Sequence, residues 1–401
     1  MKNRINRRSG RSNALLHRGT LCLALGGVLG STTVSAADAQ AAFQSASDDF
    51  TFELSGLMQA DAAFFNEDKT QIGNGQEARR VRLKAKGTIH GNWLYGIEFE
   101  LVNSPVLNNA EISYAGIKDV RINLGYFKVP FSLDYQTSNS YTMFQERSLS
   151  HDAFDPPKRI GASVEVDKDW SGGFTAELGV FGQTIPGDTE PDGDSGEGVV
   201  GRATYALVHT DASLLHVGSN AEWRDPGDGE IVQLRARPGM HLAPRLVDTG
   251  LIPGVEDNLK LGAEFAGVAG PLSLQGEYTT EQVNREVGGH LNFAGWYAQA
   301  GYFLTDDSQA ATYADGAFGR LAPHGKYGAW QLALRYDAVN LTDADFVGGE
   351  EANLTAGLNW YANRYVRMSM NYVRVLKLDR PGSPHHDDKP DMLATRLWLY
   401  F

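Results

Sequence analysis

The sequence has a single cysteine in 401 residues, Cys22, and it lies among the first 36 residues. We expect those residues to be removed on export, so the exported chain cannot form a disulfide. Long apolar runs are also missing, because no segment after residue 36 is long and apolar enough to form a transmembrane helix. The helical periodicity expected of a large soluble enzyme is absent as well. These absences favour a chain built from strands.

The first 36 residues have the order of a secretory signal peptide. Six basic residues precede the apolar run Gly19–Gly30, and Val34-Ser35-Ala36 offers a cleavage site of small residues. The apolar run is too short to span a bilayer, and Cys22 is not preceded by a lipobox-like pattern. We therefore divide the chain into a signal peptide (1–36), a short N-terminal segment (37–51) and one β-barrel (52–401).

Basic residues are scarce in the part that remains. The whole chain has 36 basic and 49 acidic residues. Residues 1–36 carry six of the basic residues and none of the acidic ones, so 30 and 49 remain, a net charge of −19. This balance argues against nucleic acid as a partner.

What the sequence does have is alternation of apolar and polar residues. Each segment of this kind is close to the 9 to 11 residues with which a tilted strand crosses a bilayer, and tryptophans recur near the segment ends. The alternating segments include 52–62, 93–101, 259–265, 272–278, 329–338 and 366–373. The chain ends on LATRLWLYF, whose alternating apolar residues close on Phe401, as in the last strand of outer-membrane barrels.

The number of strands follows from parity. We count seventeen candidate strands, but a single-chain bacterial barrel has an even number. If the short segment VQLRARP (232–238) belongs to a long loop at 224–257, sixteen strands, seven turns and eight loops remain. The turns are then expected at 91–92, 117–119, 169–172, 208–213, 268–271, 305–328 and 362–364. The connection 305–328 is too long for a turn, and the sequence offers no reason for its length.

The third loop, residues 128–158, is rich in aromatic and small polar residues. It is too apolar to extend into solvent, so we expect it to fold into the barrel and narrow the lumen that sixteen strands leave open. The predicted fold is therefore an all-β, sixteen-stranded antiparallel transmembrane β-barrel with an inward-folded third loop.

A column of basic residues lies on the second strand, in QEARRVRLKAKGTIHGNW (76–93). Arg80, Arg82, Lys84 and Lys86 occupy alternate positions, so a strand directs them to one face. Each charge facing lipid near the midplane costs about 2–4 kcal/mol, so the column is predicted to line the lumen. There it attracts anions, and several weak sites in series let an anion enter and leave. The alternative is that lumen acids such as Glu98 and Glu100 neutralise the column.

Several longer segments resemble one family. RRVRLKAKGTIHGNWLYGIEFE, ISYAGIKDVRINLGYFKVPFSLD, FQERSL, YGAWQLALRYDAVNL and GLNWYANRYVRMSMNYV are similar, in this order, to the phosphate-selective porin O and P family. The resemblance covers essentially the whole exported chain. It implies a sixteen-stranded, homotrimeric outer-membrane porin of a Gram-negative bacterium, in which an arginine ladder and the third loop take up phosphate or pyrophosphate.

The resemblance also implies an anion-binding constriction. Its residues are the arginine pair Arg79 and Arg80, the third-loop residues Ser138, Asn139 and Arg147, the large-loop residues Arg235 and Arg237, and Lys326. Three departures weaken the expected cationic path. Tyr135 replaces a third-loop lysine, Gly239 and His241 follow the shortened ladder, and Arg82 replaces an aromatic residue.

No cofactor or metal motif accompanies these residues. Asp188–Glu197 lacks the terminal glutamate of a calcium loop, and we interpret it as an acidic loop that divalent ions bridge to lipopolysaccharide. His385-His386-Asp387-Asp388 lies between prolines and is interpreted as a solvated loop.

The predicted function is diffusion of small anions, with a preference for inorganic phosphate or pyrophosphate. A general or weakly cation-selective porin is the alternative that the net charge favours. An outer-membrane barrel enzyme is a further alternative, but the histidines cluster in turns and loops and not beside a candidate serine.

Overall fold

The computed structural model describes residues 49–168, 173–185, 196–227 and 231–401. The expected signal peptide, the predicted turn at 169–172 and residues 188–195 of the acidic loop lie outside the described residues. Within the ranges described, none of the helices has the length and apolar character that crossing a bilayer requires.

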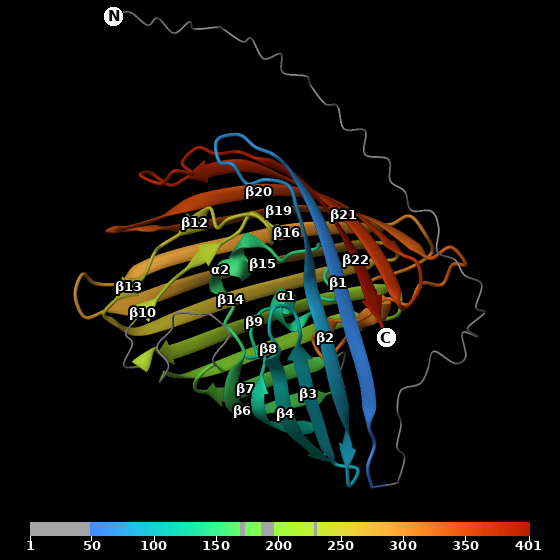
Figure 1. Ribbon diagram of the computed structural model, residues 1–401. Helices are drawn as coiled ribbons and strands as arrows, with labels where there is room; N and C mark the ends of the chain where they lie inside the picture. The colour runs from blue at the N-terminus through green and yellow to red at the C-terminus, as the bar shows by residue number, and fades with distance from the viewer. Residues whose placement is uncertain (1–48, 169–172, 186–195, 228–230) are drawn as a thin grey trace, which may run out of the picture. The chain divides into compact units, whose positions relative to one another are not determined.

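The described strands close into one antiparallel barrel in which sequence neighbours pair and the first strand pairs with the last (Figure 1). This confirms the predicted sixteen-stranded fold. The barrel strands are β1 (Glu53–Asn66), β2 (Gly75–Ile89), β3 (Trp93–Glu100), β4 (Val106–Ile117), β5 (Val120–Phe127), β6 (Arg159–Lys168), β7 (Phe174–Phe181), β8 (Glu197–His209), β9 (Ser213–Asp225), β14 (Val255–Ala269), β15 (Leu272–Arg285), β16 (Leu291–Phe303), β19 (Ala329–Asp343), β20 (Phe346–Tyr361), β21 (Val366–Asp379) and β22 (Asp391–Tyr400).

The two-residue alternation explains which side chains face outward. Leu83 lies between Arg82 and Lys84 on β2 and is exposed on the outer face, whereas both basic residues border an internal cavity. Trp330 and Trp360 stack on adjacent strands with their ring centroids 5.6 Å apart. A barrel in lipid inverts the usual arrangement, with apolar residues outside and polar residues inside.

One end of the barrel, here called the turn end, has short connections apart from 304–328. The other, the loop end, has the long connections 128–158 and 226–254 and one two-residue connection, 344–345. The predicted turns at 91–92, 117–119, 208–213, 268–271 and 362–364 each fall between paired strands. The segment 232–238 lies outside the barrel sheet, as predicted. Four two-residue strands form two small sheets in this loop: β10 (Ile231–Val232), β11 (Arg235–Ala236), β12 (Val247–Asp248) and β13 (Ile252–Pro253).

The third loop occupies residues 128–158, between β5 and β6, and packs inside the barrel. It contains α1 (Leu133–Gln136) and α2 (Leu149–Phe154), which Figure 1 shows within the ring of strands. Leu149 is fully buried, and its backbone N–H donates to Asp337 Oδ2 on β19 at 2.8 Å. The Leu133 N–H donates to Glu277 Oε2 on β15 at 3.0 Å. The inward fold predicted for this loop is therefore confirmed.

The long connection between β16 and β19, residues 304–328, also folds inward. It contains η2 (Ala310–Thr312), β17 (Tyr313–Ala314) and β18 (Ala317–Phe318). Tyr313 and Phe318 pack with Leu133 of α1 in one buried cluster. The Phe318 N–H donates to Thr137 Oγ1 of the third loop at 3.3 Å. This connection is therefore an internal support for the third loop and not a turn, which explains its length.

The seam between β1 and β22 is closed by the chain's last residue. The backbones of Gly56 and Phe401 exchange two hydrogen bonds, at 2.7 and 3.1 Å. A Cβ at position 56 would lie 2.1 Å from the Phe401 ring, so a larger residue there would displace that exposed ring.

Candidate functional site

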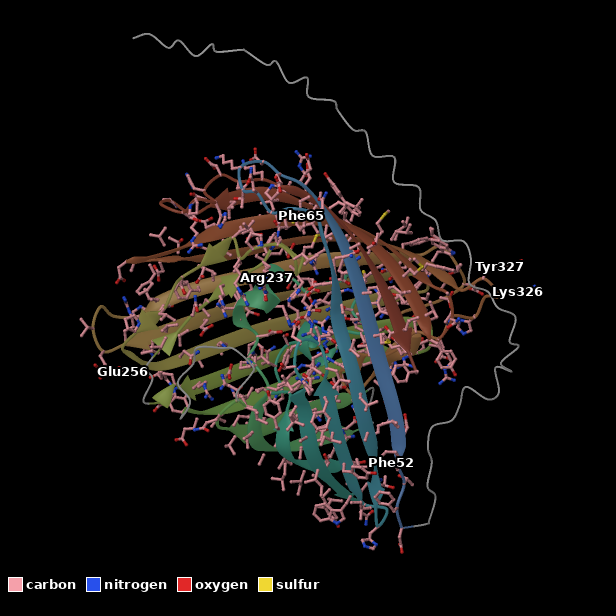
Figure 2. The ribbon with its side chains drawn as sticks, in the orientation of Figure 1. Phe52, Phe65, Arg237, Glu256, Lys326 and Tyr327 are labelled. Atoms are coloured by element: carbon pink, nitrogen blue, oxygen red, sulfur yellow. The ribbon has the colours of Figure 1, made fainter. Side chains whose placement is uncertain are left out.

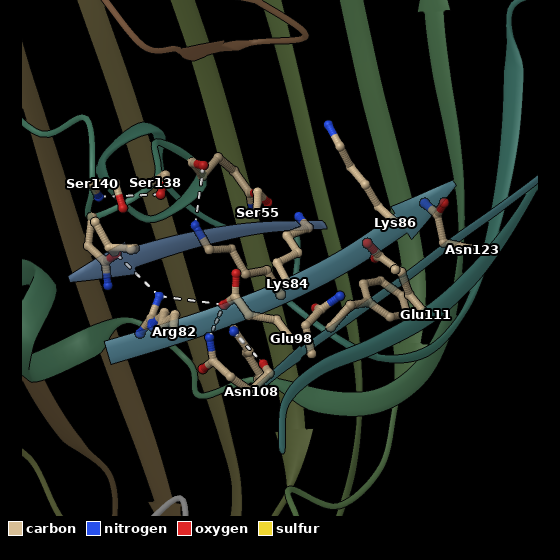
Figure 3. A pocket seen from close by; sticks show the side chains of 18 of the residues that line it. Ser55, Arg82, Lys84, Lys86, Glu98, Asn108, Glu111, Asn123, Ser138 and Ser140 are labelled. Carbon is tan, nitrogen blue, oxygen red and sulfur yellow. Dashed lines mark hydrogen bonds and ion pairs between the residues drawn. The ribbon is translucent and has the colours of Figure 1, made fainter. Parts of the chain in front are cut away.

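A cavity with a volume of about 1180 Å³ lies between the third loop and the wall formed by β1–β7. Figure 3 shows Lys84 and Lys86 rising from β2 into this space, with Ser138 and Ser140 on the loop. The basic residues that line it are Arg82, Lys84, Lys86, Arg121, Lys128, Arg147, Lys158 and Arg320. The acidic residues are Glu53, Glu98, Glu111, Asp152, Asp155, Glu165 and Glu177. The lining is therefore nearly balanced in formal charge.

The basic column on β2 is only partly neutralised. Arg82 Nε donates to Glu100 Oε2 at 2.9 Å, and its Nη1 lies 3.6 Å from Glu98 Oε1. Lys86 Nζ lies 3.3 Å from Glu53 Oε2 on β1. Within the described residues, Lys84 has neither a hydrogen bond nor an ion pair. The alternative of neutralisation by Glu98 and Glu100 therefore describes Arg82 and not Lys84.

Arg79 and Arg80 do not line this cavity. Arg79 donates to both carboxylate oxygens of Glu146 in the third loop, at 2.9 and 3.1 Å. Arg80 is 8% exposed and donates to Gln59 Oε1 at 2.9 Å. The sequence did not point to Glu146 as a partner of this pair, because Glu146 lies 67 residues from Arg79 in the chain.

Glu146 joins the third loop to both sides of the barrel seam. Besides Arg79 of β2, it accepts from Arg396 Nη2 of β22 at 2.5 Å. Arg396 is 2% exposed and also donates twice to Asp61 of β1, at 2.6 Å each. Burial raises the pKa of Glu146, but Arg79, Arg396 and Arg80 outweigh that effect and hold it well below its usual value. The ionised carboxylate is thus a clamp between loop and wall.

The predicted third-loop residues Ser138, Asn139 and Arg147 all line the cavity. Arg147 Nη2 donates to the carbonyl oxygens of Tyr135 and Thr137, at 3.2 and 2.6 Å. Its Nη1 donates to His151 Nε2 at 2.7 Å, because a guanidinium can only donate. None of the carboxylates in the part of the chain described here pairs with it, so Arg147 keeps its net positive charge.

Lys128, which the sequence analysis missed, lies beside Arg147. Its Nζ donates to the Tyr135 carbonyl oxygen at 2.5 Å and lies 5.1 Å from the centroid of the Tyr135 ring. Arg147 Cζ lies 5.7 Å from the same centroid. Burial lowers the pKa of Lys128 well below its usual value, and Arg147 and Lys158 lower it further. An anion bound at this point would oppose both effects by stabilising the charged form of Lys128.

Arg320 is a second cation that was missed. It belongs to the inward-folded connection 304–328, and its Cζ lies 4.5 Å from the Tyr400 ring centroid and 5.7 Å from that of Tyr141. Only the tertiary contacts of this connection bring Arg320 to the cavity. The sequence could have pointed to Lys128, because it is the first residue of the third loop and directly follows β5 of the barrel wall.

Arg235, Arg237 and Lys326 lie elsewhere. Arg235 and Arg237 belong to the loop between β9 and β14, and the Arg237 N–H donates to Asp152 Oδ2 at 2.7 Å. Lys326 lies beside the highly exposed Tyr327 at the tip of the connection between β16 and β19 (Figure 2). The structure therefore brings together Arg82, Lys84, Lys86, Ser138, Asn139 and Arg147, and it places the other predicted residues outside this cavity.

The loop at 385–388 is less solvated than predicted. Asp388 is fully buried and accepts from the backbone N–H groups of Lys69 and Thr70, at 3.0 Å each. His385 Nδ1 contacts Thr70 Oγ1 at 2.8 Å. These side chains hold two loops together at the loop end.

A closed barrel with a water-accessible lumen narrowed by an inward-folded loop defines a porin of the bacterial outer membrane. The chain belongs to the family "Phosphate-selective porin O and P", whose model matches residues 52–401. It is 27% identical over 394 residues to Porin O of Pseudomonas aeruginosa, covering 88% of this chain and 89% of that protein. A protein of Caulobacter vibrioides is 31% identical over 350 residues, covering 82% and 69%.

A solved structure shares the fold. The anion-selective porin from Comamonas acidovorans matches with a TM-score of 0.55 and 15% sequence identity, covering 88% of this chain and all of that one. The chain is therefore an outer-membrane porin by family and by fold.

The cavity also contains a group that titrates near neutral pH. Asp155 of the third loop contacts His151 Nδ1 and accepts from Ser132 Oγ at 3.2 Å. Burial raises the pKa of Asp155 to about 7, although Arg147 and the Ser132 hydroxyl oppose this. Burial and Arg147 lower the pKa of His151 well below its usual value, so His151 is neutral in the same range.

We expect the permeability ratio of chloride to potassium to fall as the pH rises from 6 to 8. Asp155 gains a negative charge in this interval, beside Lys128 and Arg147, and the expected change is about two- to threefold. Reversal potentials in a potassium chloride gradient measure it. Asp155→Asn should keep the high ratio at both pH values, and a pH step of unchanged size in that variant would assign the titration to another group.

Proposed function

We propose that this porin passes small anions by diffusion and favours phosphate or pyrophosphate. The observation that carries the proposal is a set of four cations in one cavity, none of which pairs with a carboxylate in the described part of the chain. They are Lys84, Lys128, Arg147 and Arg320. In a narrow passage with low-dielectric walls, unpaired cations lower the energy of an anion.

Phosphate preference is supported by the surroundings of Tyr135. Tyr135 stands where the family resemblance places a lysine, so the ammonium group of that lysine is missing. Lys128 and Arg147 supply positive charge at the same place. Lys128 Nζ and Arg147 Nη2 donate to the same oxygen, the Tyr135 carbonyl, at 2.5 and 3.2 Å. The two nitrogens therefore lie close together. A phosphate oxyanion has several acceptor oxygens and can bind both cations, with Ser138 and Asn139 on the same loop.

The homotrimer and the lipopolysaccharide contact belong to the same proposal. The homotrimer is supported by the resemblance to the porin O and P family. The acidic loop at 188–197 supports the contact with lipopolysaccharide through divalent ions. The exported chain, without its first 36 residues, is then an outer-membrane protein of a Gram-negative bacterium.

We also propose that the protein is not an enzyme. The third loop does contain a serine, a histidine and an aspartate close together. However, Ser132 Oγ donates to Asp155, and His151 Nε2 accepts from Arg147. In a catalytic triad the serine hydroxyl donates a hydrogen bond to the imidazole, and neither of these two hydrogen bonds has that arrangement.

Ion selectivity tests the proposal. The reversal potential in a potassium chloride gradient should show chloride preference, and added phosphate should block the chloride current. Lys128→Met should weaken the phosphate block about tenfold, the loss expected when one charge-assisted hydrogen bond is removed. Lys377→Met is a suitable control, because Lys377 pairs with Glu350 on the outer ends of β20 and β21 at 2.5 Å. Potassium preference in the wild-type channel would contradict the proposal and favour the cation-selective alternative.

A further inference from the structure

Two oppositely charged side chains in the cavity stand without partners. Lys84 on β2 and Glu111 on β4 both line it, and neither has a hydrogen bond or ion pair among the residues that the structure describes. Their neighbours differ, because Lys86 pairs with Glu53 at 3.3 Å and Arg121 with Glu165 at 3.1 Å. An unpaired charge in a confined lumen is a place where a charged solute gains free energy.

The two residues lie on one wall, separated by β3. Lys86 pairs with Gly96 of β3, and Gly96 pairs with Glu111, so β2 and β4 are two strand spacings apart, about 10 Å. Lys84 is the next inward-facing position on β2. Gly96 has no side chain to cover the gap, and a Cβ there would lie 3.2 Å from Glu111 Oε1. Figure 3 shows both charged side chains bordering the open space.

Further charged side chains lie near Lys84 and near Glu111. The third loop, which meets β2 where Arg82 Nη1 donates to Asn139 Oδ1 at 3.4 Å, adds the cations Lys128 and Arg147. Further along the same wall, Glu165 of β6 and Glu177 of β7 are direct cross-strand neighbours, and Glu165 pairs with Arg121 of β5. Cations therefore predominate where β2 meets the loop and carboxylates predominate towards β4–β7, while Asp152 and Asp155 of the loop and Arg121 of β5 carry the opposite sign within those two regions.

The pair of Lys84 and Glu111 discriminates between classes of solute. A simple anion is attracted by Lys84 and repelled by Glu111, and the reverse holds for a simple cation. A solute that carries both charges gains from both residues when its anionic end faces Lys84 and its cationic end faces Glu111. We propose that Lys84 and Glu111 form the two ends of a binding site for small zwitterions, which carry a carboxylate and an ammonium group several bonds apart. This inference rests on the proposed passage of solutes through the cavity and adds a solute class to it.

The test is block of chloride current through single channels in a planar bilayer. The probe is 4-aminobutyrate, a zwitterion that carries no net current, and the matched ions are butyrate and butylammonium. Low salt is used because salt screens these charges. We expect 4-aminobutyrate to block at lower concentration than either matched ion, because only the zwitterion engages both residues.

Two substitutions separate the ends of the site. Glu111→Gln should weaken block by 4-aminobutyrate about fivefold and leave block by butyrate equal or stronger. Lys84→Met should weaken block by both. A variant with Lys377→Met and Glu350→Gln removes one charge of each sign outside the cavity and should change neither.

The outcomes are distinguishable from failure of the proposed function. If Glu111→Gln leaves the ratio of the two blocking concentrations unchanged, the zwitterion site is refuted even in a chloride-selective channel. If the ratio changes as expected but the reversal potential shows no chloride preference, the site stands and anion selectivity fails. Block by 4-aminobutyrate no stronger than by butyrate also overturns the inference.

Discussion

Replacement of Glu146 by glutamine is expected to raise the chloride preference of the channel and to destabilise its constriction. The carboxylate accepts two hydrogen bonds from Arg79 and one from Arg396, whose side chain is 1% exposed. Arg396 keeps its two hydrogen bonds to Asp61, so the loss falls mainly on the partly buried Arg79 and is expected to cost about 1.5–3 kcal/mol. The same substitution releases the positive charge of Arg79 beside the pore. Reversal potential and the temperature of the heat-induced shift in electrophoretic mobility measure the two effects.

Two variants of residues in the same cluster serve as controls for Glu146→Gln. Asp61→Asn removes the other carboxylate bound to Arg396 and should lower stability with a smaller change in selectivity, because Asp61 belongs to β1 and not to the loop. Replacing Arg79 and Arg80 together by alanine leaves Glu146 with less compensation and should lower chloride preference. An unchanged preference in that double variant would remove Arg79 and Arg80 from any role in selectivity.

The second large effect is expected from shortening the connection between β16 and β19. Replacing 308–326 by an Asn-Gly turn removes Tyr313 and Phe318 from the cluster that supports α1, and it removes Arg320 from the cavity. Sixteen strands alone leave an aqueous channel, so single-channel conductance should rise about twofold or more. The strands can still pair, because the Leu304 N–H donates to the Trp330 carbonyl at 2.7 Å at the base of this connection.

Tyr327→Ser is the control for this shortening. Tyr327 lies in the same connection but is 79% exposed, so its loss should leave conductance unchanged. A shortened variant that conducts like the wild type would show that the third loop alone limits the current. A variant with raised conductance and reduced chloride preference would assign part of the selectivity to Arg320.

The barrel was predictable from sequence because its signal is local. Alternation requires only that residues i and i+2 share a face, and Lys84 and Lys86 face inward for the same reason that Leu83 faces outward. The bounds of the third loop were predictable too, since alternation stops at 128 and resumes by 159. Parity then placed 232–238 in a loop.

The state of each charge was not predictable, because ion pairs depend on contacts that are distant in the chain. Glu146 lies 67 residues from Arg79 and 250 from Arg396. Local sequence therefore could not distinguish Arg79, which is neutralised, from Lys84, which is not. The inward fold of the connection 304–328 could not be predicted for a related reason, because it depends on contacts with Thr137 and Leu133 of another loop.

The seam has a consequence for how the pore matures. Arg396 of the last strand joins Asp61 of the first strand to Glu146 of the third loop, so this junction cannot exist until the two ends of the chain have met. Tyr400, one residue from the C-terminus, donates to the Ser140 carbonyl of the same loop at 2.7 Å. The contacts of Arg396 and Tyr400 with the third loop can therefore form only after the barrel has closed, whereas the anchors of the loop on β15 and β19 do not depend on closure.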